Sequence, residues 1–176
     1  PTLQLDAELI RMQKQADFHQ QVMWAKQRCQ LGQPIPALDS LSKQVIQLKD
    51  DLSLVMVLAD AYLECKQPLK ALQLVDRQLL VADAEQAIDL QLLRAGVLLQ
   101  DKQVVQVEQL LLQLAQEPIT LSQKERYDEL ALYLAIQQGE LLYAHGRTEE
   151  ALNVVLPWLE TNPSNIELSH LVLRIY

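Results

Sequence analysis

The sequence predicts an all-α protein of about nine helices, mostly short. Leu, Ala, Gln and Glu dominate its 176 residues, and all four favour helix. Aromatic residues make up only 5% of the chain, so the runs of β-branched and aromatic residues that mark strands are missing. Apolar residues recur at helical spacing in segments that short turn signals separate. A chain of this length can bury the core of one domain.

Four helices are expected in the first half of the chain. The first is amphipathic, and Gly32 with the two prolines that follow it ends this helix, because proline cannot continue one. Asp50–Asp51 or Ser53 can cap the third helix by accepting its unpaired backbone N–H groups. The apolar face of the first helix comprises Leu5, Leu9, Met12, Ala16 and Met23. The four helices span Leu5–Leu31, Ala37–Leu48, Leu54–Cys65 and Pro68–Val81.

Five further helices follow. Asp83 can cap the first of them, and Glu117–Pro118 ends the second. Ser122 and Glu125 have the spacing of a capping box, so they predict the start of a longer helix. Thr148 can cap the next helix, which ends at Asn162-Pro163. The remaining ranges are Ala84–Leu99, Val104–Ala115, Ser122–Ala144 and about Asn165–Tyr176.

Small residues recur on both sides of four turns. The turn residues follow one another at intervals of 34, 36 and 44 residues and are Gly32, Lys66, Lys102 and Gly146. Five positions later stand Ala37, Ala71, Val107 and Ala151. Seven positions before each turn stand Ala25, Ala59, Ala95 and Gly139. Small side chains at such positions allow two helices to cross closely, which predicts a repeated helical pair.

In these positions the chain resembles the tetratricopeptide repeat (TPR) family, over about residues 18–176. The resemblance implies a right-handed α-solenoid of antiparallel helix pairs, a TPR-like superhelix, in a single domain over 1–176. The repeats would span about 18–51, 52–85, 88–121 and 132–165, followed by a terminal helix at 166–176. The sequence departs from the family in ten additional residues, Ser122–Ala131, and in polar residues at expected apolar positions: Gln21, Arg28, Gln91 and Arg94.

The resemblance also implies that the first helices of the pairs line a concave peptide-binding groove. The candidate groove residues are Val22, Met56, Leu63, Leu92, Leu99, Tyr133, Ile136 and Tyr143. Their apolar character suits a peptide with hydrophobic anchors. Lys26 stands almost alone as a cation there, which disfavours a clamp for a C-terminal carboxylate. Alternatively, these residues pack against Leu5–Gln15 or the chain's own end. Trp24 and Trp158 are expected in the core.

The function expected from these features is that of a scaffold or adaptor that holds a polypeptide segment, as in bacterial envelope, pilus or secretion assembly. One alternative is a dedicated chaperone for a secreted hydrophobic client, and another is a regulatory or oligomerisation segment of a larger protein. No motif for catalysis, phosphate binding or metal binding is present, so we expect no enzyme activity and no cofactor. The three histidines are far apart and fall in different helical phases.

Charge limits the classes of expected partner, whereas the cysteine content does not determine the cellular compartment. The formal net charge of -8 disfavours nucleic acids and anionic membranes, so another protein is the expected partner. A homodimer through the apolar terminal helix is an alternative. Cys29 and Cys65 are expected as unpaired thiols, with one disulfide if the chain is exported. We expect a soluble protein, cytoplasmic or periplasmic. The sequence starts at Pro1, so either an initiator Met has been removed or the chain is a segment of a longer protein. We favour the segment, because the last helix has an unusually apolar face.

Overall fold

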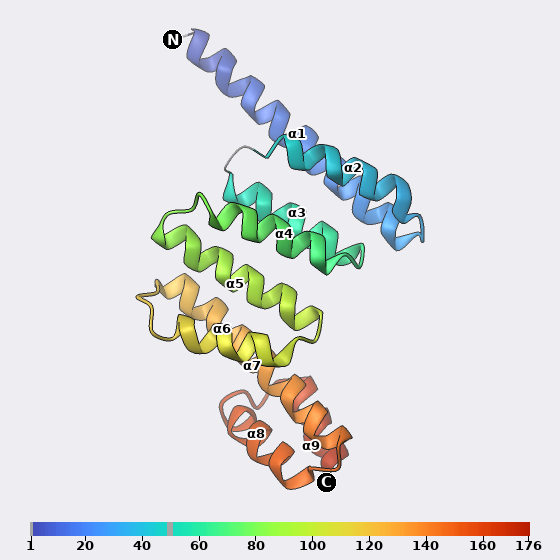
Figure 1. The fold of residues 1–176 in the computed structure, drawn as a ribbon, viewed down its shortest axis with the longest axis vertical. Helices are drawn as coiled ribbons and strands as arrows, with labels where there is room; N and C mark the ends of the chain where they lie inside the picture. Colours follow the sequence, from blue (N-terminus) through green and yellow to red (C-terminus); the bar gives the residue numbers. More distant parts are fainter. Residues whose placement is uncertain (1, 49–50) are drawn as a thin grey trace. The chain divides into compact units, whose positions relative to one another are not determined.

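The computed structural model describes residues 2–48 and 51–176, so Pro1, Lys49 and Asp50 lie outside the described residues. Within the described ranges the chain is all-α, with nine helices and no strand (Figure 1). The helices are α1 Thr2–Gln30, α2 Pro34–Ile46, α3 Leu52–Glu64, α4 Pro68–Leu79, α5 Ala84–Gln100, α6 Val104–Leu114, α7 Leu121–Ala144, α8 Thr148–Thr161 and α9 Ile166–Ile175. For these residues the predicted all-α class and the number of helices are confirmed, and the helix bounds differ from the predicted ones by three residues at most.

The helices form two compact units, residues 1–86 and 87–176. In the first unit, α1 packs on α2 and α3, and α3 also packs on α4. In the second unit, α7 packs on α6, α8 and α9, and Gly96 of α5 approaches Leu130 of α7. The grouping of both units into one solenoid domain stays a prediction.

The four turns expected at equivalent positions share one backbone geometry. In each turn a single residue adopts positive φ, between 57° and 73°. The residue after it donates its N–H to a carbonyl five positions earlier, at 2.8–2.9 Å, which is the Schellman ending of an α-helix. The positive-φ residues are Gly32, Lys66, Lys102 and Gly146. The turn prediction is therefore confirmed, including the two lysines, although positive φ is unusual for a residue with a side chain.

The small residues that flank these turns are buried. Seven of the eight have exposed fractions of 0%, and the eighth, Gly139, is also buried. A Cβ atom on Gly139 would lie 2.4 Å from Val155 Cγ1 of α8 and 3.1 Å from Leu171 Cδ2 of α9. The absence of a side chain at Gly139 thus allows three helices of the second unit to meet closely.

Two predicted helix caps are wrong, and two are confirmed. The capping box of α7 pairs Thr120 with Gln123 instead of Ser122 with Glu125, because the helix begins one residue earlier than predicted. The N-cap of α8 is the residue before Thr148 and makes no side-chain cap. Asp83 does cap α5, accepting the Gln86 N–H at 2.8 Å.

Asp51 caps α3, as predicted for this segment. Its carboxylate accepts hydrogen bonds from the Ser53 hydroxyl at 2.7 Å and the Ser53 N–H at 3.1 Å. These hydrogen bonds, the hydroxyl foremost, lower the pKa of Asp51 despite its partial burial. The other acid proposed for this cap, Asp50, lies outside the described residues.

Cys29 and Cys65 form a disulfide bond, so the expectation of unpaired thiols is wrong. The bond joins the ends of α1 and α3, whose Cα atoms lie 5.2 Å apart at these two residues. The 36-residue separation follows from the repeat, because each cysteine stands near the end of the first helix of a pair. Two residues that are distant in sequence are thereby adjacent across neighbouring helices.

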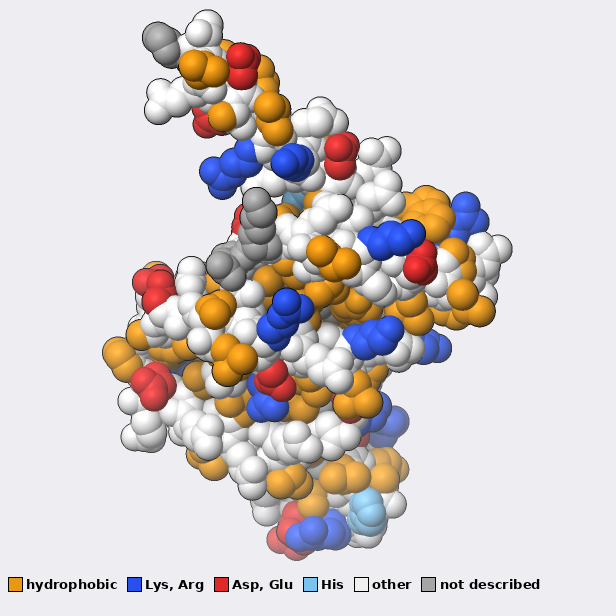
Figure 2. Space-filling model, turned by 45° about the horizontal axis from the view of Figure 1, so that its top comes forward, with side chains coloured by type: hydrophobic (Ala, Val, Ile, Leu, Met, Phe, Trp, Pro, Cys, Tyr) orange, Lys and Arg blue, Asp and Glu red, His pale blue; other side chains and the backbone are white. Residues whose placement is uncertain are grey.

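The predicted apolar face of α1 is exposed, which corrects the sequence-based assignment. Leu5, Leu9, Met12 and Met23 are 57–64% exposed, whereas Phe18, Val22 and Ala25 face the core. Figures 1 and 2 show that the start of α1 extends beyond the other helices of its unit and carries hydrophobic side chains. The α1 helix therefore has two apolar faces, and the shorter one packs on α2 and α3.

In the described parts of the chain, no helix is both long enough and apolar enough to cross a membrane. Nor do three or more histidine, cysteine or acidic side chains gather there in a way that could hold a metal ion.

Candidate functional site

The predicted groove residues divide into buried and accessible positions. Val22, Leu92, Leu99 and Ile136 are only 1–5% exposed, so they lie in the core and offer little surface to a peptide. Leu63 is half-buried. The accessible positions, at 36–44% exposure, are Met56, Tyr133 and Tyr143. Peptide binding at these accessible positions stays a prediction.

Ile136 is covered by the end of the chain. It belongs to a hydrophobic cluster with residues of α8 and α9, among them Val155 and Leu171. The self-packing alternative therefore holds for this residue. The buried face of α9 is formed by Leu168, Leu171, Val172 and Ile175, so the terminal helix packs on the preceding pair. Its opposite face is exposed at Ile166, Leu173 and Tyr176, and a homodimer through it stays a prediction.

Polar side chains connect neighbouring first helices at a separation of 34 residues. Lys26 of α1 forms ion pairs of 2.8 Å with both Asp60 and Glu64 of α3. Burial alone would lower the pKa of the Lys26 ammonium, but the hydrogen bonds and charges of the two carboxylates outweigh it and raise the pKa. Because its charge is already paired, Lys26 is poorly suited to clamp the carboxylate of a peptide.

The same 34-residue relation appears twice in the second unit. Gln123 Nε2 donates to Asp89 Oδ1 at 2.9 Å, and Arg174 Nη2 donates to Glu140 Oε1 at 3.2 Å. These contacts link α5 with α7 and α7 with α9. Residues at equivalent repeat positions of these three helices therefore lie beside one another, which is an observation separate from the turn geometry.

The exposed surface of α7 offers two aromatic side chains. Tyr133 and Tyr143 are 41% and 36% exposed and lie ten residues apart, about 15 Å along the helix. Glu140 lies between them in sequence and is also exposed, but its carboxylate is paired with Arg174. The exposed tyrosines can bind an apolar peptide segment, because tyrosine combines an apolar ring with a polar hydroxyl.

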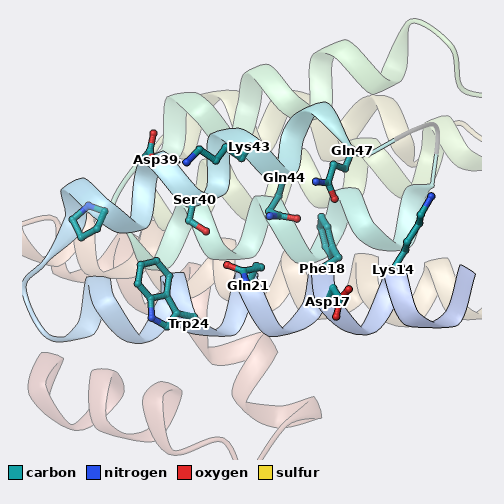
Figure 3. A pocket seen from close by; sticks show the side chains of 11 residues that line it. Lys14, Asp17, Phe18, Gln21, Trp24, Asp39, Ser40, Lys43, Gln44 and Gln47 are labelled. Atoms are coloured by element: carbon teal, nitrogen blue, oxygen red, sulfur yellow. Dashed lines mark ion pairs between the residues drawn. The ribbon is translucent and has the colours of Figure 1, made fainter. Parts of the chain in front are cut away.

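A second candidate surface is a cleft of about 590 Å³ between α1 and α2, which we call the α1/α2 groove (Figure 3). Side chains from both helices line it. Those from α1 are Lys14, Asp17, Phe18, Gln21 and Trp24, and those from α2 are Pro36, Asp39, Ser40, Lys43 and Gln44; Gln47 follows the helix. Lys14 and Trp24 are ten residues apart, so the groove extends about 15 Å along α1.

Charges in the α1/α2 groove balance one another. Two lysines and two aspartates line it, and Lys43 forms an ion pair of 3.1 Å with Asp39. The remaining polar groups are the neutral amides Gln21, Gln44 and Gln47 and the hydroxyl of Ser40. The groove therefore combines apolar and polar surface and carries no net charge, in contrast to the acidic chain as a whole.

Trp24 stands at one end of this groove and is 37% exposed, so its predicted place in the core is wrong. The Arg28 guanidinium lies 5.2 Å from the centroid of its ring, within the range of a cation–π contact. Trp158, by contrast, is partly buried against the core cluster of the second unit, in agreement with the prediction.

Gln44 is only 7% exposed, and Figure 3 shows its amide directed into the α1/α2 groove. Among the described residues, no side chain or backbone group makes a hydrogen bond to this amide. The buried polar atoms without a partner in those residues are Gln91 Oε1 and Gln137 Oε1, so the Gln44 amide, although its residue is largely buried, is reached by water from the groove. The groove therefore presents a primary amide that no protein group engages.

The equivalent face of the α3/α4 pair is apolar. One repeat after Gln21, Trp24 and Ser40 stand Val55, Leu58 and Leu74, which are 0%, 0% and 6% exposed. The substitution of polar for apolar residues at Gln21 was visible in the sequence as a departure from the repeat. Gln44 gave no such signal, because the equivalent residue of the α3/α4 pair is also glutamine, Gln78.

Comparison with known proteins gives one relative of limited similarity. Over 165 residues the chain is 25% identical to "Cellulose synthase operon protein C" of Pseudomonas fluorescens (strain SBW25). The aligned region covers 94% of this chain but only 13% of that protein. No family model matches the chain. No solved structure matches it either. The all-helical fold is compatible with the tetratricopeptide resemblance.

Proposed function

We propose that the chain is a TPR-like α-solenoid scaffold that binds a segment of another protein and has no enzymatic activity. The observation that carries this proposal is the fourfold recurrence of one positive-φ turn between paired helices. Side-chain contacts between residues 34 apart support it, because a stack of helix pairs brings equivalent positions of adjacent pairs together.

The disulfide favours an oxidising compartment for this scaffold. Disulfides persist in the periplasm and outside the cell but are rare in the cytosol, where thiols are kept reduced. Cys29–Cys65 closes a loop of 36 residues inside the first unit, where it stabilises the α1–α3 contact. We therefore propose a periplasmic location, which the sequence had left open beside the cytoplasm.

The relative suggests a setting for the proposed function. Its name assigns that protein to a cellulose synthase operon, and its similarity to this chain extends over most of the 176 residues. We propose that this chain serves in an assembly that produces or exports a polysaccharide, and that it holds another protein of that assembly. Neither the chaperone nor the regulatory alternative is favoured by a particular contact.

The surface of α7 around Tyr133 and Tyr143 is the proposed binding site in the second unit. A photo-crosslinking amino acid at position 133 or 143 should form a covalent adduct with one partner in periplasmic extracts of the native host, identified by mass spectrometry. Position 69 is the control, because Leu69 of α4 is more accessible, at 70% exposure, but belongs to the first unit and lies outside the predicted groove. The same adduct from position 69, or no adduct from positions 133 and 143, would contradict the proposal.

A further inference from the structure

We infer that the α1/α2 groove is a binding site for a neutral oligosaccharide chain. The inference concerns a different surface from the proposed protein-binding site on α7. It rests on the chemistry of three features that meet in the groove: an exposed indole ring, an amide that faces the groove and is engaged by no protein group, and neutral polar side chains along both walls.

Trp24 provides the surface on which a sugar ring can stack. The C–H groups on one face of a pyranose ring form an apolar patch that matches the face of an aromatic ring. Arg28 approaches the Trp24 ring to 5.2 Å and leaves the indole 37% exposed at the groove. A stacked sugar would also remove this large apolar side chain from water, which is favourable.

Gln44 provides the hydrogen bonds. A primary amide offers two N–H donors and a carbonyl acceptor, and a sugar hydroxyl both donates and accepts. A hydroxyl near Gln44 can therefore satisfy an amide that the described residues leave unpaired. Gln21 and Ser40 lie on facing walls beside it, as Figure 3 shows, and extend the same pattern along the groove.

The charge balance selects against ionic ligands. Lys14 and Lys43 are offset by Asp17 and Asp39, so the groove has no excess of cations for a phosphate or an acidic polysaccharide. A peptide is disfavoured for another reason. Peptide grooves gain specificity from apolar pockets for side chains, whereas Trp24 is the one exposed large hydrophobic side chain among the lining residues.

The length of the groove fits a chain better than a monosaccharide. Its lining extends about 15 Å along α1, which accommodates several consecutive sugar rings. The choice of a glucan as the first probe rests on the proposed function, because the relative is named for a cellulose synthase operon. The chemistry of the groove by itself requires only a neutral oligosaccharide.

The test is a titration of the 176-residue chain with cellohexaose and maltohexaose, followed by calorimetry and by the NMR signal of the Trp24 indole N–H. Oligogalacturonate provides an acidic control, and a polar peptide of similar length provides a peptide control. We expect a neutral hexasaccharide to bind and to shift the Trp24 signal, whereas the two controls should not bind.

Two substitutions separate binding from folding. Trp24→Ala should abolish binding, and Gln44→Leu should weaken it about tenfold, the equivalent of losing one hydrogen bond. Circular dichroism should show that Gln44→Leu is folded, because leucine is similar in size and has no amide to leave unpaired. The matched control is Gln78→Leu, which changes the equivalent residue of the α3/α4 pair and should bind as the unsubstituted chain does.

The outcomes distinguish this site from the proposed protein-binding function. Absence of binding by both neutral hexasaccharides, or equal binding by the Gln44→Leu and Gln78→Leu variants, would overturn the inference. Binding of the peptide in place of the saccharides would also overturn it and would assign the groove to a protein partner. The crosslinking experiment at positions 133 and 143 does not involve the α1/α2 groove. The protein-binding proposal and the saccharide-binding inference can therefore be refuted separately.

Discussion

Replacement of Gly139 by alanine should destabilise the protein, because the glycine lies where α7, α8 and α9 meet. The new methyl carbon would stand 2.4 Å from Val155 Cγ1 and 3.1 Å from Leu171 Cδ2, whereas carbon atoms in contact prefer about 3.5–4.0 Å. Overpacking costs about 1–3 kcal/mol, and a separation as short as 2.4 Å places this clash in the upper half of that range, at about 2–3 kcal/mol. Alanine is a better helix former than glycine by about 1 kcal/mol. We therefore expect a net loss of about 1–2 kcal/mol of unfolding free energy.

Gly96→Ala is the matched control, since Gly96 is also a buried glycine in a helix. Its added Cβ would meet the end of the Arg126 side chain at 3.1 Å and Leu130 Cδ2 at 3.8 Å. The guanidinium can move aside, and the leucine distance is an ordinary contact. Here the gain in helix propensity should dominate, so the variant should be equally stable or more stable by up to about 1 kcal/mol.

Urea denaturation followed by circular dichroism at 222 nm provides the measurement for both variants. The unfolding free energies should be compared only where the slopes of free energy against urea agree, because a changed slope indicates a change in the unfolding transition. The reasoning would be refuted if Gly139→Ala were as stable as the unsubstituted chain. A loss of similar size for Gly96→Ala would also refute it, since glycine would then be required in α5 for another reason.

Three further predictions concern the disulfide and two helix caps. Replacing Cys29 and Cys65 by alanine should lower the unfolding free energy by about 3–4 kcal/mol, because the bond restricts the loop that it closes in the unfolded chain. Reduction of the unsubstituted protein should have the same effect, and equal urea midpoints with and without reductant would contradict this. Thr120→Ala should cost about 1 kcal/mol in urea denaturation, whereas Ser122→Ala should change little; the opposite order would restore the cap predicted from the sequence. The folded-state pKa of Asp51 is lowered, so its carboxylate contributes fully to the unfolding free energy above the unfolded pKa of about 3.9. This contribution disappears as pH falls through the lower folded value. Asp51→Ala should therefore lower the melting temperature at neutral pH and have no effect in strong acid, which thermal denaturation across pH would measure; an unchanged effect in acid would contradict the prediction.

Helix positions were predictable from the sequence because the signals are local. Proline and glycine marked the turns, and short polar residues marked most helix starts. The errors at Ser122 and Thr148 are of one kind, since a residue with a capping side chain stands within two positions of the true N-cap. Several residues near a helix start satisfy the same statistical pattern, and only the backbone conformation selects the residue that caps the helix.

The interior and the exterior of α1 were less predictable. Its two apolar faces both have helical spacing, and the sequence-based choice favoured the face with Leu5, Leu9 and Met12. The structure buries Phe18, Val22 and Ala25 instead, because these residues point toward α2 and α3. Periodicity identifies an apolar face, but the neighbouring helices decide which face is covered.

The candidate sites show the same limit. The repeat frame placed Val22, Leu92, Leu99 and Ile136 on a binding surface, but packing of adjacent helices buries them. Met56, Tyr133 and Tyr143 are accessible in the same frame. The position of a residue within its repeat therefore predicts which face of the helix carries it. Its exposure depends on how closely the neighbouring helices pack on that face.

The sequence by itself determined the all-α class, the helix number and the four equivalent turns, because these depend on residue types within a few positions of one another. Only the tertiary structure decided the Cys29–Cys65 pairing and the α1/α2 groove that contains Trp24 and Gln44. Both depend on the distance between helices that are separated by many residues in the chain. Such distances are set by packing, for which a single sequence carries no local signal.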